Sequence, residues 1–120
     1  MSDIKQYIGD ESVDDPEKAD RRRELADWSE SAAEGIAAQE GLSLTPEHWD
    51  VLHFLREHYV EHGPTPAREL TRRLEERYAG RGGLRHLYTL FPGGPVHQGS
   101  RIAGVPEPEG AVDRSFGSVR

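Results

Sequence analysis

The sequence predicts a small, mainly α-helical protein, and three observations support this fold class. Apolar residues recur every three or four positions over most of residues 29–91, as they do along the buried face of a helix. The pair Thr-Pro, which suits a helix start, occurs at 45–46 and at 65–66, and glycines follow the apolar runs. We therefore expect a small orthogonal helical bundle with a helix-turn-helix-like element and an extended C-terminal arm.

Composition narrows the chemistry open to this chain. It has 120 residues, 34% of them hydrophobic, a formal charge of -7 and no cysteine. A chain of this length forms one domain at most. Without a thiolate it cannot use a disulfide framework, a cysteine nucleophile, a persulfide or a cysteine-ligated metal. No apolar run reaches the ~20 residues that span a bilayer, and no secretory signal is visible, so we expect a cytoplasmic protein without membrane contact.

The N-terminal residues 1–26 form an acidic segment that we expect to be weakly ordered, because it shows no sustained hydrophobic period. It is compatible with a short β-hairpin in which Tyr7-Ile8 and Ser12-Val13 pair across a turn at Gly9-Asp10. Residues 16–24 are compatible with a loose helix or with a solvated linker.

A helical domain is expected over residues 27–103. Its first helix is capped by Ser29 and ends at Gly41, with its apolar positions at Ala32, Ala33, Ile36 and Ala37. The second runs from Pro46 to about His62, with Thr45 as N-cap and Gly63 as its stop. Its expected inward residues are Trp49, Leu52, Leu55 or Phe54, and Tyr59.

The third helix is expected to begin with Thr65 as its cap and Pro66 at its first position. Leu70, Leu74 and Tyr78, at four-residue intervals, mark its inward face. A shorter apolar helix over 84–91 stops at the break Pro92–Pro95, and another is expected over 96–103. Beyond Gly104, prolines prevent regular structure, so residues 104–120 are expected to form an extended arm and tail.

One basic segment interrupts an otherwise acidic chain. Between residues 66 and 101, seven arginines face three acids. Four of these arginines form a stripe on the third helix that could bind nucleic acid or an acidic protein: Arg68, Arg72, Arg73 and Arg77. A DNA-binding regulator is therefore one alternative function, although the net charge of -7 and the absence of lysine from this segment weigh against it.

The segment His58-Tyr59-Val60-Glu61-His62 matches the H-x-x-E-H pattern of some zinc peptidases. Two histidines four residues apart share a helix face and can hold zinc, but a catalytic site needs a third ligand and a substrate cleft. Solvated histidines on a helix explain the pattern more simply. We predict no metal, no cofactor and no catalytic residue.

A resemblance to a known family rests on blocks that occur in order between residues 27 and 112. These blocks are Asp27-Trp28, Gly41-Leu42-Ser43-Leu44-Thr45-Pro46-Glu47-His48-Trp49, Phe54-Leu55-Arg56, Leu87-Tyr88, Leu90-Phe91-Pro92, Gly94-Pro95 and Arg101-Ile102-Ala103-Gly104-Val105-Pro106-Glu107-Pro108. In these blocks the chain resembles the DsrC/TusE family, whose dissimilatory members are also described as sulfite reductase gamma subunits.

The resemblance implies a small helical sulfur-relay protein with a C-terminal arm. Family members carry a persulfide on a cysteine near the chain end. They pass sulfur between a sulfur-transfer complex and a sulfite reductase or a tRNA-thiolation enzyme. The arm of DsrC itself holds a second cysteine. The implied partner-binding residues here are Arg101, Ile102, Gly104, Pro106 and Pro108.

The two cysteine positions of the family correspond to Ser100 and Ala111 on the arm, so both are vacant here. Neither residue can carry sulfur, because serine forms no stable sulfur–sulfur bond and alanine has no functional group. The chain also continues for eight residues beyond Val112, where family members tend to end. It resembles the cysteine-free, RspA-like branch. We therefore expect a non-catalytic regulatory protein, with a sulfurtransferase whose cysteines were mutated away as a further alternative.

Overall fold

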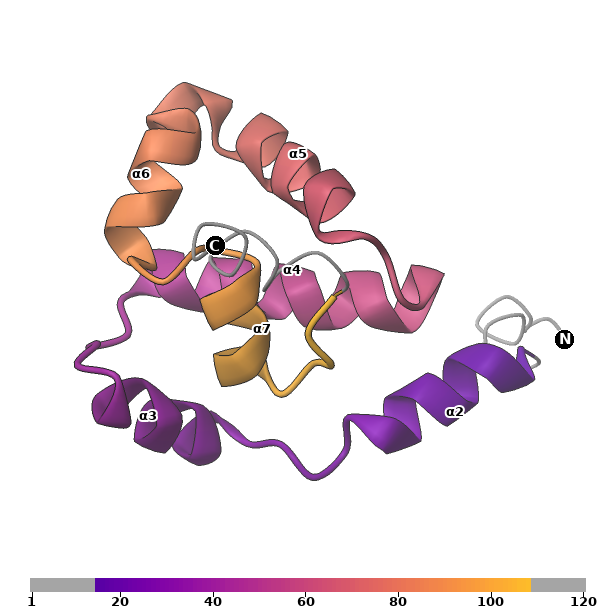
Figure 1. Cartoon of the computed structure of the whole chain (residues 1–120). Coiled ribbons are helices and arrows are strands. Elements are labelled where there is room, and N and C mark those ends of the chain that lie inside the picture. The colour runs from indigo at the N-terminus through magenta and orange to yellow at the C-terminus, as the bar shows by residue number, and fades with distance from the viewer. Residues whose placement is uncertain (1–14, 109–120) are drawn as a thin grey trace, which may run out of the picture.

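The computed structural model describes residues 15–108, and within this range it contains six α-helices, one 3-10 turn and no strand (Figure 1). The helices are α2 (Pro16–Glu24), α3 (Glu30–Gln39), α4 (Pro46–His62), α5 (Ala67–Arg77), α6 (Gly83–Leu90) and α7 (His97–Ala103), with the 3-10 turn η1 (Ala79–Arg81). The predicted mainly helical class is confirmed. The hairpin predicted near Gly9-Asp10 lies outside the described residues.

Local sequence signals set most helix ends. The Ser29 hydroxyl accepts a hydrogen bond from the Ala32 amide at 3.0 Å and caps α3. Thr45 caps α4, and its own amide donates to His48 Nδ1, which completes a reciprocal capping box. Gly63 ends α4 with φ +75°, a conformation that glycine adopts without a Cβ penalty. Residues 16–24, for which the sequence left two alternatives, are helical.

The helix α7 lies at the centre of the molecule, where it packs against both α3 and α4 (Figure 1). The helices α5 and α6 pack on each other across the opposite side of α4, and α2 lies along the end of α4. The core that these helices enclose includes the fully buried side chains of Leu52, Leu74, Tyr78, Leu87, Phe91 and Ile102. Burial of each such side chain contributes about 1.5–3 kcal/mol.

The inward residues predicted for α5 are confirmed, since Leu70, Leu74 and Tyr78 are all buried. For α4 the predicted stripe is partly wrong: Trp49 is only half-buried, whereas Val51 and His48 are buried. The cause is α7, which approaches α4 so closely that a Cβ on Gly99 would lie 3.0 Å from Leu55 Cδ1 and 3.8 Å from Val51 Cγ1. Because α7 packs there, the buried face of α4 is the one that carries Val51.

Thr65 does not cap α5 as predicted; the N-cap position is Pro66, which offers no side-chain hydrogen bond. The Thr65 hydroxyl instead donates to the Gly63 carbonyl at 3.1 Å and lies 3.1 Å from His58 Nε2. Because a hydroxyl carries one proton, it accepts from the His58 ring. Thr65 thus closes the connection between α4 and α5.

The helix α5 turns back along α4. At its C-terminal end the buried Tyr78 hydroxyl donates to Asp50 Oδ2 at 2.8 Å and lies 3.2 Å from the Glu47 carbonyl oxygen, both near the start of α4. The helices α4 and α5 are therefore joined by a short turn, and α5 runs antiparallel to α4; the helix-turn-helix assignment of this pair stays a prediction. None of the helices in residues 15–108 has the length and apolar character needed to cross a membrane.

Candidate functional site

The structure places Ser100 inside α7 rather than on the arm. Its side chain is fully buried, and its hydroxyl has no hydrogen-bond partner. Its backbone is integrated as well, because the Ser100 carbonyl accepts from the Val105 amide at 3.0 Å. A group at this position is therefore closed to a partner in this conformation. The second predicted position, Ala111, lies outside the described residues.

The end of α7, from which the arm departs, is held by side chains of other segments. The Trp28 indole donates to the Ile102 carbonyl at 2.9 Å, and Arg56 Nη1 donates to the Ala103 carbonyl at 2.8 Å. The Arg56 guanidinium also stacks 4.1 Å from the Trp28 ring centroid. Two carbonyls that the helix leaves unpaired are thereby satisfied, and the arm starts from a fixed point.

Gly104 reverses the chain direction at this point with φ +72°, and a Cβ there would lie 2.6 Å from Trp28 Cδ1. Of the predicted partner-binding residues, Ile102 is fully buried in the core, and Gly104 packs on the Trp28 ring. Gly104 and Pro106 are exposed, and both Arg101 and Pro108 are partly exposed. A partner can reach these four residues directly.

Arg101 connects the arm to the body. Its guanidinium donates to Glu40 at the end of α3, with Nε–Oε2 2.7 Å and Nη2–Oε1 3.0 Å. This bond lowers the pKa of the Glu40 carboxyl, and a further hydrogen bond from Gln98 acts in the same direction. Arg101 Nη1 also lies 3.4 Å from Glu107 Oε2 on the arm. The sequence indicated Arg101, and Glu107 stands in the same sequence block, but Glu40 lies 61 positions from Arg101 and shares no block with it.

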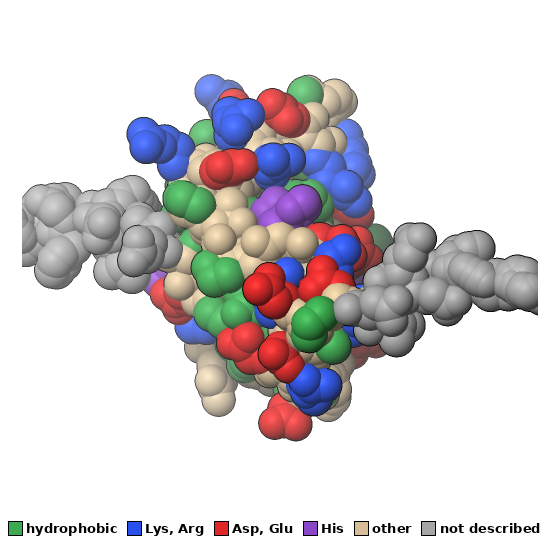
Figure 2. Space-filling view, turned by 90° about the vertical axis from the view of Figure 1, so that its right-hand side faces the viewer, with side chains coloured by type: hydrophobic (Ala, Val, Ile, Leu, Met, Phe, Trp, Pro, Cys, Tyr) green, Lys and Arg blue, Asp and Glu red, His purple; other side chains and the backbone are tan. Residues whose placement is uncertain are grey.

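A cavity of about 420 Å³ lies beside the base of the arm. Its walls come from the end of α4, the connection to α5, and the arm itself, and include Leu55, His58, Tyr59, Leu70, Pro106 and Pro108. Figure 2 views the molecule from the end at which α4 stops. A histidine side chain occupies the middle of this face, with Lys and Arg gathered above it.

His58 does not form the zinc site that the H-x-x-E-H pattern suggested. Its buried ring stacks on Phe54, with centroids 5.7 Å apart, and lies 4.5 Å from the His62 ring centroid. Burial lowers the pKa of the His58 imidazole, and the neighbouring His62 lowers it further. Within residues 15–108 no three His, Cys, Asp or Glu side chains gather as metal ligands. The pair serves packing at the α4 end.

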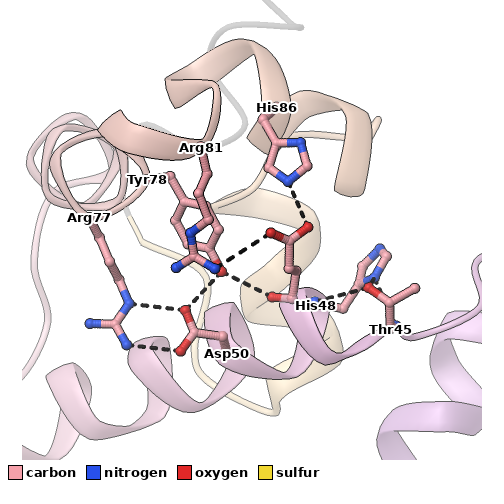
Figure 3. A network of polar contacts seen from close by, with 8 residues as sticks. Thr45, His48, Asp50, Arg77, Tyr78, Arg81 and His86 are labelled. Atoms are coloured by element: carbon pink, nitrogen blue, oxygen red, sulfur yellow. Dashed lines mark hydrogen bonds and ion pairs between the residues drawn. The ribbon is translucent and has the colours of Figure 1, made fainter.

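The arginine stripe is largely engaged with acids of the same chain. Arg77 binds Asp50 through Nε–Oδ2 3.1 Å and Nη2–Oδ1 2.9 Å (Figure 3). Along α5 itself, Arg73 Nη2 lies 3.1 Å from Glu69 Oε2, and Arg72 Nη1 lies 3.7 Å from Glu76 Oε2. Among the four predicted stripe residues, Arg68 has no ion pair with any described residue. Much of the predicted positive charge is therefore neutralised in place.

Figure 3 shows that the contact between Arg77 and Asp50 belongs to a wider network between α4 and the α5–α6 connection. Glu47 accepts from His86 Nε2 at 2.8 Å and pairs with Arg81 at 3.5 Å. His48, which the sequence did not single out, donates from Nε2 to the Leu90 carbonyl at 2.7 Å and so ties α4 to the end of α6. Because this network holds the helices together, we take the arm base as the candidate functional site.

Comparison with known proteins finds relatives over most of this chain. The family model described as "DsrC like protein" matches residues 18–112. The sulfurtransferase TusE of Shigella dysenteriae serotype 1 (strain Sd197) is 46% identical over 88 residues, which cover 72% of this chain and 81% of the relative. TusE of Escherichia coli (strain K12) is 44% identical over the same coverage.

Two solved structures are similar to this chain. The solution structure of Allochromatium vinosum DsrC has a TM-score of 0.63 and 44% identity, covering 72% of this chain and 79% of that protein. The oxidized gamma-subunit of dissimilatory sulfite reductase (DsrC) from Archaeoglobus fulgidus has a TM-score of 0.59 and 32% identity, covering 70% and 79%.

Proposed function

The chain belongs to the DsrC-like protein family, and on that premise we propose that it is a non-catalytic member that regulates a sulfur-relay pathway. It would bind a sulfur-transfer complex or a sulfite-reductase-like protein without carrying sulfur itself. One observation carries this proposal: the chain has the family fold but no cysteine.

The chemical step of a sulfur relay needs a thiolate, which attacks a persulfide and holds the transferred sulfur in a sulfur–sulfur bond. The residues that correspond to the family cysteines are Ser100 and Ala111. The Ser100 hydroxyl is also buried within α7, where a sulfur-donating protein cannot reach it. A relay partner could therefore bind this protein but could not load it.

The surface proposed for that partner is the exposed part of the arm base, with Arg101, Pro106 and Pro108. Pro106 and Pro108 line the cavity between α4 and the arm together with Glu107, and Arg101 contacts that carboxylate. A related scaffold that presents this surface without a thiol would compete with the sulfur-carrying relatives for their partners. Competition of this kind would reduce the sulfur flux.

Two measurements test the proposal. The protein is first incubated with a persulfide-loaded sulfurtransferase, and its intact mass is recorded; we expect no added sulfur. It is then immobilised and exposed to a purified sulfur-transfer complex or sulfite reductase; we expect retention of that partner and displacement of a cysteine-bearing relative. Stable sulfur addition, or failure to retain either partner, would contradict the proposal.

A DNA-binding regulator is the alternative function, and the ion pairs of Arg72, Arg73 and Arg77 weigh against it. Arginines that are already neutralised release fewer counterions from a phosphate backbone. The discriminating measurement is a mobility-shift titration at low salt. Binding that weakens steeply with salt and disappears in the Arg72→Glu/Arg73→Glu variant would favour this alternative.

A further inference from the structure

We infer that Glu107 is the positioning residue of the C-terminal arm, because it closes a charge clamp made of Glu40, His97, Arg101 and Glu107. The clamp sets the direction in which the chain leaves the helical body after Pro106. This inference rests on the proposed function, since it concerns how the arm is presented to a partner.

Arg101 is the centre of the clamp and contacts all three other members. On the body side it forms the bidentate bond with Glu40 described above. On the arm side, Arg101 Nη1 lies 3.4 Å from Glu107 Oε2 and 3.1 Å from His97 Nε2. One guanidinium therefore links the end of α3, the start of α7 and the arm.

The contacts also assign the two ring nitrogens of His97 different roles. A guanidinium only donates hydrogen bonds, so His97 Nε2 accepts from Arg101 and the ring proton lies on Nδ1. That atom is 3.0 Å from Glu107 Oε1, although the N–H is not aligned well enough to form a hydrogen bond. Glu107 is thus held mainly by electrostatic attraction to the charged Arg101 guanidinium, with the Nδ1–H end of the His97 ring adding a partial positive charge.

The two sides of the clamp differ in strength. The Glu40 side chain is 22% exposed, forms short bonds to Arg101 and accepts from Gln98 Nε2 at 2.8 Å. The Glu107 side chain is 33% exposed, and its contacts are longer or poorly aligned. The bond between Arg101 and Glu40 is therefore the stable one, and the contact between Arg101 and Glu107 is the one that can break.

The other contacts at the arm base determine which residues could move if Glu107 separated from Arg101. Up to Val105 the chain is fixed, because Trp28 and Arg56 hold the end of α7, and Val105 is buried and donates to the Ser100 carbonyl. Within residues 106–108, the polar side-chain contacts that hold the arm to the helical body are those of the Glu107 carboxylate. While the clamp is closed, Pro106 and Pro108 form part of the cavity wall.

The test measures backbone motion in the free protein by ¹⁵N relaxation, comparing Glu107→Ala with the unaltered chain. We expect the order parameter of the residue 107 amide to fall from about 0.85 to below about 0.6, while that of Ile102 stays unchanged. Salt at 1 M should loosen residue 107 in the unaltered protein but have little further effect in Glu107→Ala, since ion pairs are screened. Glu75→Ala is the matched control, because Glu75 is exposed on α5 and has no ion pair with a described residue.

An unchanged order parameter at residue 107 would overturn the inference, and so would an equal loss at Ile102, which would indicate that α7 itself had loosened. Glu107→Gln keeps one acceptor oxygen and should give an intermediate value; a value equal to that of the unaltered chain would show that the charge is not needed. No partner is present in this experiment. A negative result in this experiment therefore does not contradict the proposed function, and a failed partner capture does not contradict the inference about the clamp.

Discussion

At the residue scale, Ser100 is packed inside the helical core but has no group that can carry sulfur. Its hydroxyl is buried without a hydrogen-bond partner, an arrangement that costs about 1–3 kcal/mol relative to a satisfied group. The residue thus destabilises the helix that leads to the arm.

Replacement of Ser100 by alanine should therefore stabilise the protein. We expect Ser100→Ala to raise the free energy of unfolding by about 1 kcal/mol in urea titrations, because it removes the unpartnered hydroxyl and leaves only a small void. The control is Ser31→Ala on the exposed face of α3, which reports the helix-propensity gain alone. A change no larger than that of the control would show that the Ser100 hydroxyl is satisfied in solution.

The two vacant positions also differ in what a restored thiol could do. We expect Ala111→Cys to take up one sulfur atom from a persulfide-loaded donor, as read by intact mass. Ser100→Cys should take up none, because residue 100 is fully buried in α7. Uptake by the Ser100 variant would mean that α7 opens readily, and lack of uptake by the Ala111 variant would mean that the chain has lost more than its thiols.

At the element scale, the sequence predicted the helices well where local groups decide their ends. Thr45, Pro46 and Gly63 act within a few residues of themselves, so their roles could be predicted from spacing. Thr65 is followed by proline, as Thr45 is, but it has a different role, because its hydroxyl contacts His58 from the preceding helix. The bond between Arg101 and Glu40 joins residues 61 positions apart, and no helical period encodes it.

Among the glycines of residues 15–108, Gly104 at the junction between α7 and the arm should tolerate substitution least. We expect Gly104→Ala to lower the free energy of unfolding by about 2 kcal/mol or more, since it forces an alanine into φ +72° and places a Cβ 2.6 Å from Trp28. Chemical denaturation checks this. Gly35→Ala in α3 is the control: open space surrounds that site, and the change should stabilise by about 0.5–1 kcal/mol.

At the scale of the whole molecule, the uneven charge of the sequence acquires a structural reason. The acidic segment before residue 65 and the basic segment after it fold onto each other, so that Asp50 meets Arg77 and Glu47 meets Arg81. The Arg77 bond lowers the pKa of the Asp50 carboxyl. The arginine stripe was predicted as a surface for nucleic acid or an acidic partner, but which of its charges remain available depends on the antiparallel return of α5, which the sequence pattern does not specify.

The global stability should depend on pH through His58, whose burial lowers the pKa of its imidazole below the ordinary 6.5. The folded state favours the neutral ring, so below pH 6.5 the unfolded state binds more protons than the folded state. This contribution is complete above pH 6.5 and is lost as the pH falls through the pKa of the folded state. We therefore expect urea midpoints to decrease from pH 7 to pH 5, and His58→Gln to reduce that decrease, whereas His53→Gln, at an exposed site, should leave it unchanged. An equal pH dependence in the unaltered chain and in His58→Gln would show that the ring is not held neutral by burial.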